Sequence, residues 1–558
     1  MVYNTSFPTI QTSRIRLEGS SLRSFSCNGE LGFRTNWIID RLENQRPFSK
    51  EYIIGQISGE AGAWTNFPRV HGDIAGRWIL AETVIHSNED TPPENLTAIV
   101  NEVLSLQDDD GSFGCIHKID QPLNMHRMYG NGWLLRALVQ YAFTFGDREV
   151  VQAAIRLGDF YIAEFPLWIA SDLGERETGF YAITRSCYFH AIDGLVALYR
   201  LTKMAKYLDL IGQFIPHLTP YETSDHSHMY LTIQRGLIEY YWEKGDREAI
   251  GAISDTLEEV YQQEIFENAG VPERFHLSGE ENFTDEACSL FDWFFCCIRL
   301  YEIKGVTSWL DRAILTLENA IYFNQTYNGG FGSTTVEPHL FPTCKEAPWC
   351  CSLYGGWALS RIGGHLVSEE DGVLTINYPV GGTWNFTDSS FTIVVDEREG
   401  KLLVTSLGTH FKALRLYVPQ WMDVEGASNT FITVEAENSS VELHFSYLPW
   451  LSRVGASPQP LSAQSKGEKQ LLYGPYLMAH RGGEPVEIAD CKGEVTWLKG
   501  FQYYPECFRY VVPAHISYSI YDVFLGVEEE NNQLYFYPVK VKESPDGITT
   551  HVIMKKER

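Results

Sequence analysis

The chain has 558 residues, of which 44% are hydrophobic and 21% are charged, so it is too long for one ordinary domain and too apolar to be disordered. Its 44 Lys and Arg residues against 72 Asp and Glu residues give a net charge of −28, which disfavours binding to nucleic acids and anionic membranes. No apolar run approaches the roughly 18 residues of a membrane span, and Met1–Pro8 carries no secretory signal, so we expect a cytoplasmic protein.

The first two-thirds of the chain are predicted to be helical. A short strand is expected at Arg14–Leu17, and between Asp73 and Ile362 apolar residues recur at helical spacing. Short turns such as Gly146-Asp147 and Gly245-Asp246 favour antiparallel neighbours, which predicts a closed ring of helical hairpins. The expected helices are Asp73–His86, Leu96–Gln107, Tyr129–Phe145, Glu149–Glu164, Ile192–Leu201, Met229–Glu243, Glu248–Ile265, Glu286–Ile303 and Ser308–Tyr322.

After Gly364 the pattern changes to short alternating runs that are typical of β-sandwich strands. We expect strands at Leu374–Tyr378, Phe391–Val395, Leu402–Thr405, Leu414–Val418, Val441–Phe445, Leu534–Val539 and Ile548–Met554. The polar segment Ser457–Lys469 is expected to separate two β-modules. We therefore predict an N-terminal strand segment at 1–20 that packs on a β-sandwich, a helical domain at 21–365, and β-sandwiches at 366–465 and 466–558.

Two cysteine-containing motifs carry the strongest chemical signal. Glu286-Ala287-Cys288 and Cys350-Cys351 each come at the start of a predicted helix, where the positive end of the helix dipole stabilises thiolates. Three thiols and one carboxylate are sufficient ligands for a tetrahedral zinc ion. The alternative is that these cysteines are ordinary core residues, as we expect for Cys296-Cys297.

Further candidates for catalysis and binding lie in predicted loops. Glu273, in Pro272–Phe275, is a candidate general acid if an aromatic pocket raises its pKa, and a solvated partner of Arg274 otherwise. His126, His226 and His228 come near the starts of helical runs, where a ring of hairpins gathers its loops at one mouth. The alternative for each histidine is a capping or packing role.

Taken together, these motifs resemble glycoside hydrolase family 127, the β-L-arabinofuranosidase family. The resemblance follows the family's order along most of the chain. It rests on Asp110–Phe113, His126–Tyr129, Leu198–Thr202, Pro272–Phe275, Glu286–Cys288, Cys350-Cys351, Leu414–Trp421 and Tyr473–Pro475. The chain departs from the family pattern after Cys351, where Ser352-Leu353-Tyr354 replaces Pro-Pro-Asn. It also departs at Tyr188, which aligns with a pocket histidine and leaves His190 as the neighbouring candidate.

The resemblance implies an (α/α)6 barrel followed by β-sandwich domains. It implies zinc (Zn2+) as cofactor, a retaining double displacement through a cysteine thioglycosyl intermediate, and removal of a terminal β-L-arabinofuranosyl or related sugar. The expected partners are small oligosaccharides or glycosides. Neither a nucleic acid nor a membrane is an expected partner, and a homodimer stays open. The implied residues are Glu286, Cys288, Cys350 and Cys351 for zinc, Cys350 as nucleophile, Glu273 as acid/base, and His126, His226 and His190 for substrate.

Two other functions stay open at this point. One is a metal-independent glycosidase or lyase on the same helical barrel that uses carboxylates alone, in which Cys350 would be dispensable. The other is a non-catalytic carbohydrate-binding protein whose cysteine cluster is structural.

Overall fold

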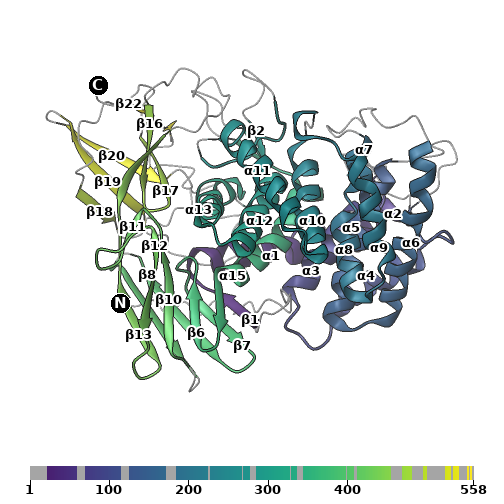
Figure 1. Cartoon of the computed structure of the whole chain (residues 1–558), viewed down its shortest axis with the longest axis horizontal. Helices are drawn as coiled ribbons and strands as arrows, with labels where there is room; N and C mark the ends of the chain where they lie inside the picture. The colour runs from purple at the N-terminus through teal and green to yellow at the C-terminus, as the bar shows by residue number, and fades with distance from the viewer. Residues whose placement is uncertain are drawn as a thin grey trace.

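A computed structural model gives the fold of the chain (Figure 1). It describes residues 22–58, 70–114, 125–170, 184–223, 226–266, 268–276, 284–326, 328–335, 343–397, 399–407, 411–453, 468–480, 494–498, 522–529, 532–538, 550–551 and 553–555. The strand predicted at Arg14–Leu17 and most of the Ser457–Lys469 separator lie outside these residues.

Helices alternate between an inner and an outer ring, as expected for an (α/α)6 barrel. Each inner helix packs against the next, and the last packs against the first, which closes the ring. The inner helices are α3 (Asp73–Ile85), α5 (Met125–Phe145), α8 (Ile192–Thr202), α10 (Ser227–Lys244), α12 (Ala287–Lys304) and α15 (Leu353–Leu366). The outer helices are α1 (Gly29–Asn44), α4 (Glu94–Ser105), α6 (Arg148–Ala170), α9 (Lys206–Phe214), α11 (Arg247–Gln263) and α13 (Thr307–Thr316).

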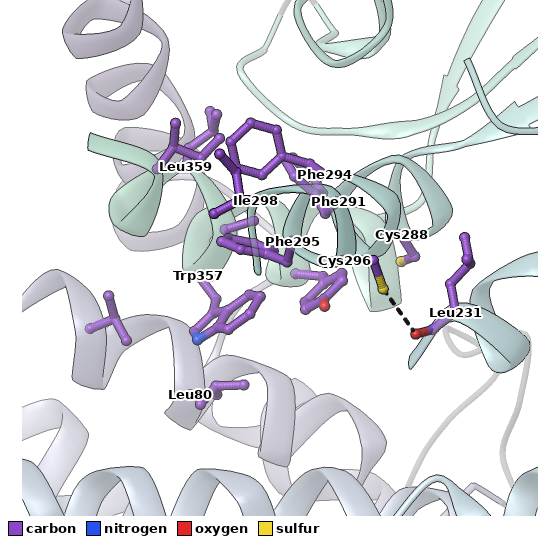
Figure 2. Packing of buried hydrophobic residues seen from close by; sticks show 14 of the residues in the cluster. Leu80, Leu231, Cys288, Phe291, Phe294, Phe295, Cys296, Ile298, Trp357 and Leu359 are labelled. Carbon is purple, nitrogen blue, oxygen red and sulfur yellow. Dashed lines mark hydrogen bonds between the residues drawn. The ribbon is translucent and has the colours of Figure 1, made fainter. Parts of the chain in front are cut away.

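Sequence pattern explains which helices lie inside. Every residue of α3 is buried, whereas α4 buries Leu96, Ile99, Val100 and Val103, one apolar stripe at helical spacing. A helix that is covered on all sides fits the inner ring, and a helix with one apolar stripe fits the outer ring. Figure 2 shows the inner packing, in which Trp357 of α15 lies between Leu80 of α3 and Phe295 of α12, and the Phe295 and Trp357 ring centroids are 5.0 Å apart.

Turn chemistry joins the hairpins as predicted. Gly245, at φ 69°, is the left-handed C-cap of α10, and the next residue, Asp246, accepts a hydrogen bond on Oδ1 from the Ala249 N–H at 3.0 Å. One Gly-Asp dipeptide therefore ends one helix and begins the next.

Periodicity does not predict α1 or α2 (Lys50–Ser58). Helix α1 buries Arg34, Asp40 and Arg41 beside its apolar residues, and Arg34 donates to the Tyr322 carbonyl at 2.9 Å. Partners far along the chain satisfy Arg34 and Arg41, so these buried charges interrupt the apolar pattern of α1.

The β-region follows the barrel and forms two facing sheets, then a third sheet (Figure 1). Strands β1 (Leu22–Cys27), β7 (Gly382–Phe386), β8 (Ser390–Asp396), β9 (Lys401–Ser406) and β13 (Ser440–His444) form an antiparallel sheet in this spatial order. Strands β12 (Thr430–Glu435), β10 (Ala413–Val418), β6 (Val373–Ile376) and β5 (Val367–Glu370) form the second sheet, in which β10 and β6 run parallel. The third sheet includes β15 (Pro449–Arg453), β16 (Glu468–Tyr473), β17 (Tyr476–His480), β18 (Glu494–Leu498), β19 (Asp522–Glu529) and β20 (Asn532–Pro538).

The predicted fold class, a helical barrel followed by β-sandwich sheets, is confirmed.

A small sheet inside the barrel region, of β2 (Thr284–Glu286), β3 (Gly332–Thr335) and β4 (Thr343–Glu346), leads into α12. Within the described part of the chain, no helix combines the length and the apolar character needed to cross a membrane.

The close approach of α3 and α5 depends on Gly76. A Cβ at this position would lie 2.6 Å from the backbone N of Leu134, so Gly76→Ala forces two inner helices apart. We expect it to destabilise the fold by about 1–3 kcal/mol, measured as a lower midpoint of thermal unfolding. The matched control is Gly251→Ala in α11, where a Cβ meets no atom within 4 Å, and where alanine should stabilise the helix by about 0.5–1 kcal/mol. Equal effects of the two substitutions would contradict this packing.

Candidate active site

Glu286, Cys288, Cys350 and Cys351 lie together at the inner-helix N-termini, and their ligand atoms are all within 4.8 Å of one another. The Cys351 Sγ is 3.6 Å from both the Cys288 Sγ and the Cys350 Sγ. The Glu286 Oε1 lies 3.5 Å from the Cys351 Sγ and 4.0 Å from the Cys350 Sγ. The structure thus brings together the four residues that the sequence singles out.

Local structure explains the placement of these four residues. Glu286 ends β2 and is the N-cap of α12, so Cys288 stands in the first turn of that helix. Cys350 and Cys351 lie in a single wide turn, Pro348–Ser352, that leads into α15. Both motifs therefore sit at helix starts, as predicted.

Ser352, the first residue after Cys351, stabilises this turn. Its hydroxyl donates to the Glu346 Oε1 at 2.8 Å and accepts from the Phe331 N–H at 3.0 Å. Ser352 therefore ties the cysteine turn to β4, which explains how the chain holds this turn where the family pattern has proline.

The charges in the cluster favour a cation. Burial and the neighbouring charges of Cys350 and Glu273 raise the pKa of Glu286 well above its usual value. Hydrogen bonds from the Cys288 and Cys351 thiols hold the pKa of Cys350 well below its usual value. Burial raises the pKa of those two donor thiols. Loss of protons from these four acidic groups would leave several negative charges close together, which a bound cation would neutralise.

The donor set fits zinc. The Zn–S bond of about 2.3 Å places sulfur ligands of a tetrahedral ion roughly 3.8 Å apart, close to the two 3.6 Å separations of the cluster. The buried Glu286 Oε2 accepts no hydrogen bond from any described residue, so this carboxylate has capacity for a cation.

Glu273 and His226 lie next to the cluster. The carboxylates of Glu273 and Glu286 and the ring of His226 bring ligand atoms within 4.8 Å of one another. The backbone of Glu273 is fixed on both sides, because its carbonyl accepts from the Ser227 N–H and its N–H donates to the Thr284 carbonyl. Burial and the charge of Cys350 raise the pKa of Glu273, which suits a proton donor.

His226 is the N-cap of α10, where its Nδ1 accepts from the Met229 N–H at 3.3 Å. Burial, with the charges of His228 and Arg274, lowers the pKa of His226 to about 3. The neutral imidazole therefore caps α10 and also lies beside the carboxyl groups of Glu273 and Glu286.

A buried polar network contacts the cysteine cluster through Arg77. Arg77 of α3 donates to the Cys288 Sγ at 3.5 Å and to the Tyr129 hydroxyl at 2.6 Å, and it pairs with the Asp73 carboxylate at 2.7 Å. Its guanidinium also lies 3.9 Å from the ring centroid of Trp133. Arg77 is not among the residues predicted for the site, although a charged residue in a run as apolar as α3 is a detectable signal.

Asp292 of α12 is the acceptor at the centre of this network. Its Oδ2 lies 2.6 Å from both the His228 Nδ1 and the Thr232 hydroxyl, and its Oδ1 accepts from the Tyr354 hydroxyl at 2.5 Å. Arg235 approaches the same carboxylate at 3.3 Å. His228 is thereby oriented with its Nε2 toward Arg77 and Tyr129.

The remaining predicted residues lie farther from the cluster or outside the description. His190 is buried and packs edge-on against Tyr129, with ring centroids 4.4 Å apart, and neither of its ring nitrogens bonds to a described residue. Tyr188 lies in an aromatic cluster with Trp168 and donates to the Tyr161 carbonyl. The side chain of His126, at the start of α5, is outside the described residues.

Comparison with known proteins agrees with this arrangement. The model of the GH127 β-L-arabinofuranosidase catalytic domain matches residues 33–332. A GH127 β-L-arabinofuranosidase from Geobacillus stearothermophilus T6 superimposes with a TM-score of 0.68 at 14% identity, over 96% of this chain and 100% of the other. A second GH127 β-arabinofuranosidase superimposes with a TM-score of 0.67 at 13% identity, over 99% of both chains. A structure described as a glycoside hydrolase gives 0.65 at 14% identity, over 96% of this chain and 98% of the other. No curated protein sequence is significantly similar to the chain.

The network around Asp292 predicts a large effect of Asp292→Asn. Although burial alone would raise the pKa of Asp292, Arg235 and His228 hold it below its usual value. The carboxylate therefore stabilises the fold at pH above about 4, and this stabilisation is lost as the pH falls through its lowered pKa. At pH 8 we expect Asp292→Asn to cost about 3–5 kcal/mol, measured by thermal unfolding.

Asp311→Asn is the matched control for this prediction. Burial raises the pKa of Asp311 to about 7, so its contribution to stability is present below about pH 4 and is lost as the pH rises through 7. The control should therefore leave the unfolding midpoint at pH 8 unchanged or higher. A midpoint of Asp292→Asn equal to that of the wild type at pH 8 would rule out the structural role of the network.

Proposed function

The chain belongs to glycoside hydrolase family 127 and is a glycoside hydrolase, and we propose that it removes a terminal β-L-arabinofuranosyl or related sugar with retention of configuration. The observation that carries this proposal is the position of Glu273. Its carboxyl group lies within 4.8 Å of Glu286, which in turn lies within 4.8 Å of the Cys350 thiol. A proton donor and a nucleophile therefore stand beside the same carboxylate.

Cys350 would act as the nucleophile and Glu273 as the general acid and base. The Cys350 thiolate attacks the anomeric carbon, a C–S bond forms, and the glycosidic C–O bond breaks as Glu273 gives its proton to the leaving oxygen. Glu273 then takes a proton from water, whose oxygen attacks the same carbon and releases the thiolate. Two displacements on one carbon retain its configuration.

Glu286, Cys288, Cys350 and Cys351 would hold zinc. With zinc bound, the thiols would be kept as thiolates at neutral pH. The chain itself contributes the Arg77 guanidinium, which donates to the Cys288 Sγ at 3.5 Å and holds that thiol in place.

The substrate class is supported by the names of the similar solved structures, a β-L-arabinofuranosidase and a β-arabinofuranosidase. His226, beside Glu273, would contact the sugar, with His126 and His190 as further substrate-binding candidates. The substrates would be small oligosaccharides or glycosides. The cytoplasmic location, the homodimer and the domain boundaries at 20, 365 and 465 stay predictions.

A carboxylate-only mechanism is the second candidate, and one observation favours it. The carboxyl groups of Glu273 and Glu286 have ligand atoms within 4.8 Å of each other, and a pair of carboxyl groups that lie this near one another is the catalytic set of retaining glycosidases that use a carboxylate nucleophile. In that mechanism Glu286 attacks the sugar and no metal is needed. The non-catalytic alternative is disfavoured by the family assignment.

Metal analysis tests the thiolate site. Cys288→Ala is expected to lower the zinc content of the zinc-equilibrated full-length protein by one equivalent, because a ligand is lost, measured by inductively coupled plasma mass spectrometry. Cys296→Ala is the matched control, since Cys296 lies on the same helix but its thiol points to the Leu231 carbonyl at 3.7 Å (Figure 2). Equal zinc in Cys288→Ala and the wild type would remove the metal from the proposal.

Hydrolysis of p-nitrophenyl β-L-arabinofuranoside tests the chemistry. Glu273→Gln is expected to lower kcat/KM about 10²–10⁴-fold, because the acid and base are lost. Cys350→Ser is expected to abolish turnover, with Cys296→Ala retaining it. If Cys350→Ser keeps wild-type activity while Glu286→Gln loses it, the carboxylate mechanism replaces the thiolate one. If the wild type leaves this glycoside intact, another sugar is the substrate.

A further inference from the structure

A second group of metal-binding side chains lies on α1 and α3, away from the cysteine cluster. Glu43 in the last turn of α1, Glu82 of α3 and His86, the C-cap of α3, place one ligand atom each within 4.8 Å of one another. The His86 Nε2 is 3.1 Å from the Glu43 Oε1 and 3.5 Å from the Glu82 Oε2. Nine residues separate His86 from Arg77 at the cysteine cluster, which corresponds to about 13 Å along the helix axis.

Glu82 is the feature of this group that calls for a ligand. Its side chain is 0% exposed, yet neither carboxylate oxygen accepts a hydrogen bond from any described residue. The His86 Nε2 lies 3.5 Å from the Glu82 Oε2. A buried carboxylate is costly unless it is hydrogen-bonded or bound to a cation, and Glu82 points toward the other two ligands.

His86 has the geometry of a metal ligand. Its Nδ1 lies 2.7 Å from the Glu89 Oε1, so the Nδ1–H is donated to that carboxylate and Nε2 is directed at Glu43 and Glu82. Histidines that bind metals commonly donate their other ring N–H to a carboxylate in this way, which fixes the ring and its tautomer.

The backbone adds to the preference for a cation. Glu43 stands one residue before the end of α1, and His86 caps the end of α3. The C-termini of two helices, each the negative end of a helix dipole, therefore meet at the same three side chains. Glu89 adds a third carboxylate at the rim, where its side chain is 54% exposed.

We propose that Glu43, Glu82 and His86 bind a divalent transition-metal ion, with zinc as the best fit, that links the C-terminal ends of α1 and α3. One imidazole nitrogen and two carboxylates match the ligands of zinc, whereas magnesium and calcium prefer oxygen ligands alone. Zinc bonds of about 2.0–2.1 Å place tetrahedral N and O ligands roughly 3.3 Å apart, and the two measured separations, 3.1 and 3.5 Å, bracket this value. The site is independent of the proposed catalytic zinc.

Zinc stoichiometry tests the proposal. The full-length protein is equilibrated with zinc chloride, freed of unbound metal by gel filtration, and measured by inductively coupled plasma mass spectrometry. His86→Ala and Glu82→Gln should each carry one equivalent less than the wild type. His365→Ala is the matched control, because His365 also pairs with a glutamate, Glu302 at 2.8 Å, in the last turn of α15. It should keep the wild-type content.

The test compares the zinc content of the wild type with that of His86→Ala, so its result does not depend on whether the cysteine site binds zinc. If that site binds no zinc, the wild type and His86→Ala should still differ by one equivalent, and Cys288→Ala should not change the total. Equal zinc in folded wild type and His86→Ala overturns the proposal.

If His86→Ala and Glu82→Gln fail to fold, Glu43→Gln tests the proposed zinc site. Glu43 is 31% exposed, so this change should leave the fold intact. We expect the dissociation constant of one zinc ion, measured by chelator competition, to rise at least tenfold. An unchanged constant overturns the proposal.

Discussion

Closure of the inner ring is the constraint on which the rest of the structure depends. Because α15 packs against α3 and α12, the Cys350-Cys351 turn at its start is brought against Cys288, which lies more than sixty residues earlier in the chain. The inner helices that carry Arg77, Cys288 and Cys351 begin at the same end of the barrel, so three separate segments meet around one cluster. If α15 did not pack against α3 and α12, the ligands of the cluster would be separated.

The charges of the site are balanced by neighbours in the same ring. Arg77 stands between the Asp73 carboxylate and the Cys288 thiol, with its guanidinium over the Trp133 ring. The Asp292 carboxylate pairs with Arg235 and His228. Removing such groups from water is costly, and the ion pairs and hydrogen bonds among them offset that cost. The groups that support the site are therefore both charged and buried.

Two locations on α3 carry different chemistry. Its first turns face the cysteine cluster through Arg77, while its end presents Glu82 and His86 to α1. The polar residues of this buried helix thus lie at its two ends, and the segment between them, which includes Ile79 and Leu80, packs in the core. One inner helix could in this way support catalysis at one end and structural metal binding at the other.

The sequence by itself determined the helical ring, the β-sheets that follow it and the four residues of the cysteine cluster. These depend on local signals: apolar spacing, Gly-Asp turns, and thiols at helix starts. Only the tertiary structure decided the roles of Arg77, Asp292 and His86, and revealed α1, whose buried Arg34 interrupts its apolar pattern. Each of these residues has a partner on another segment of the chain, up to 291 residues away for Arg34, so the reason for each buried charge exists only once the ring has closed.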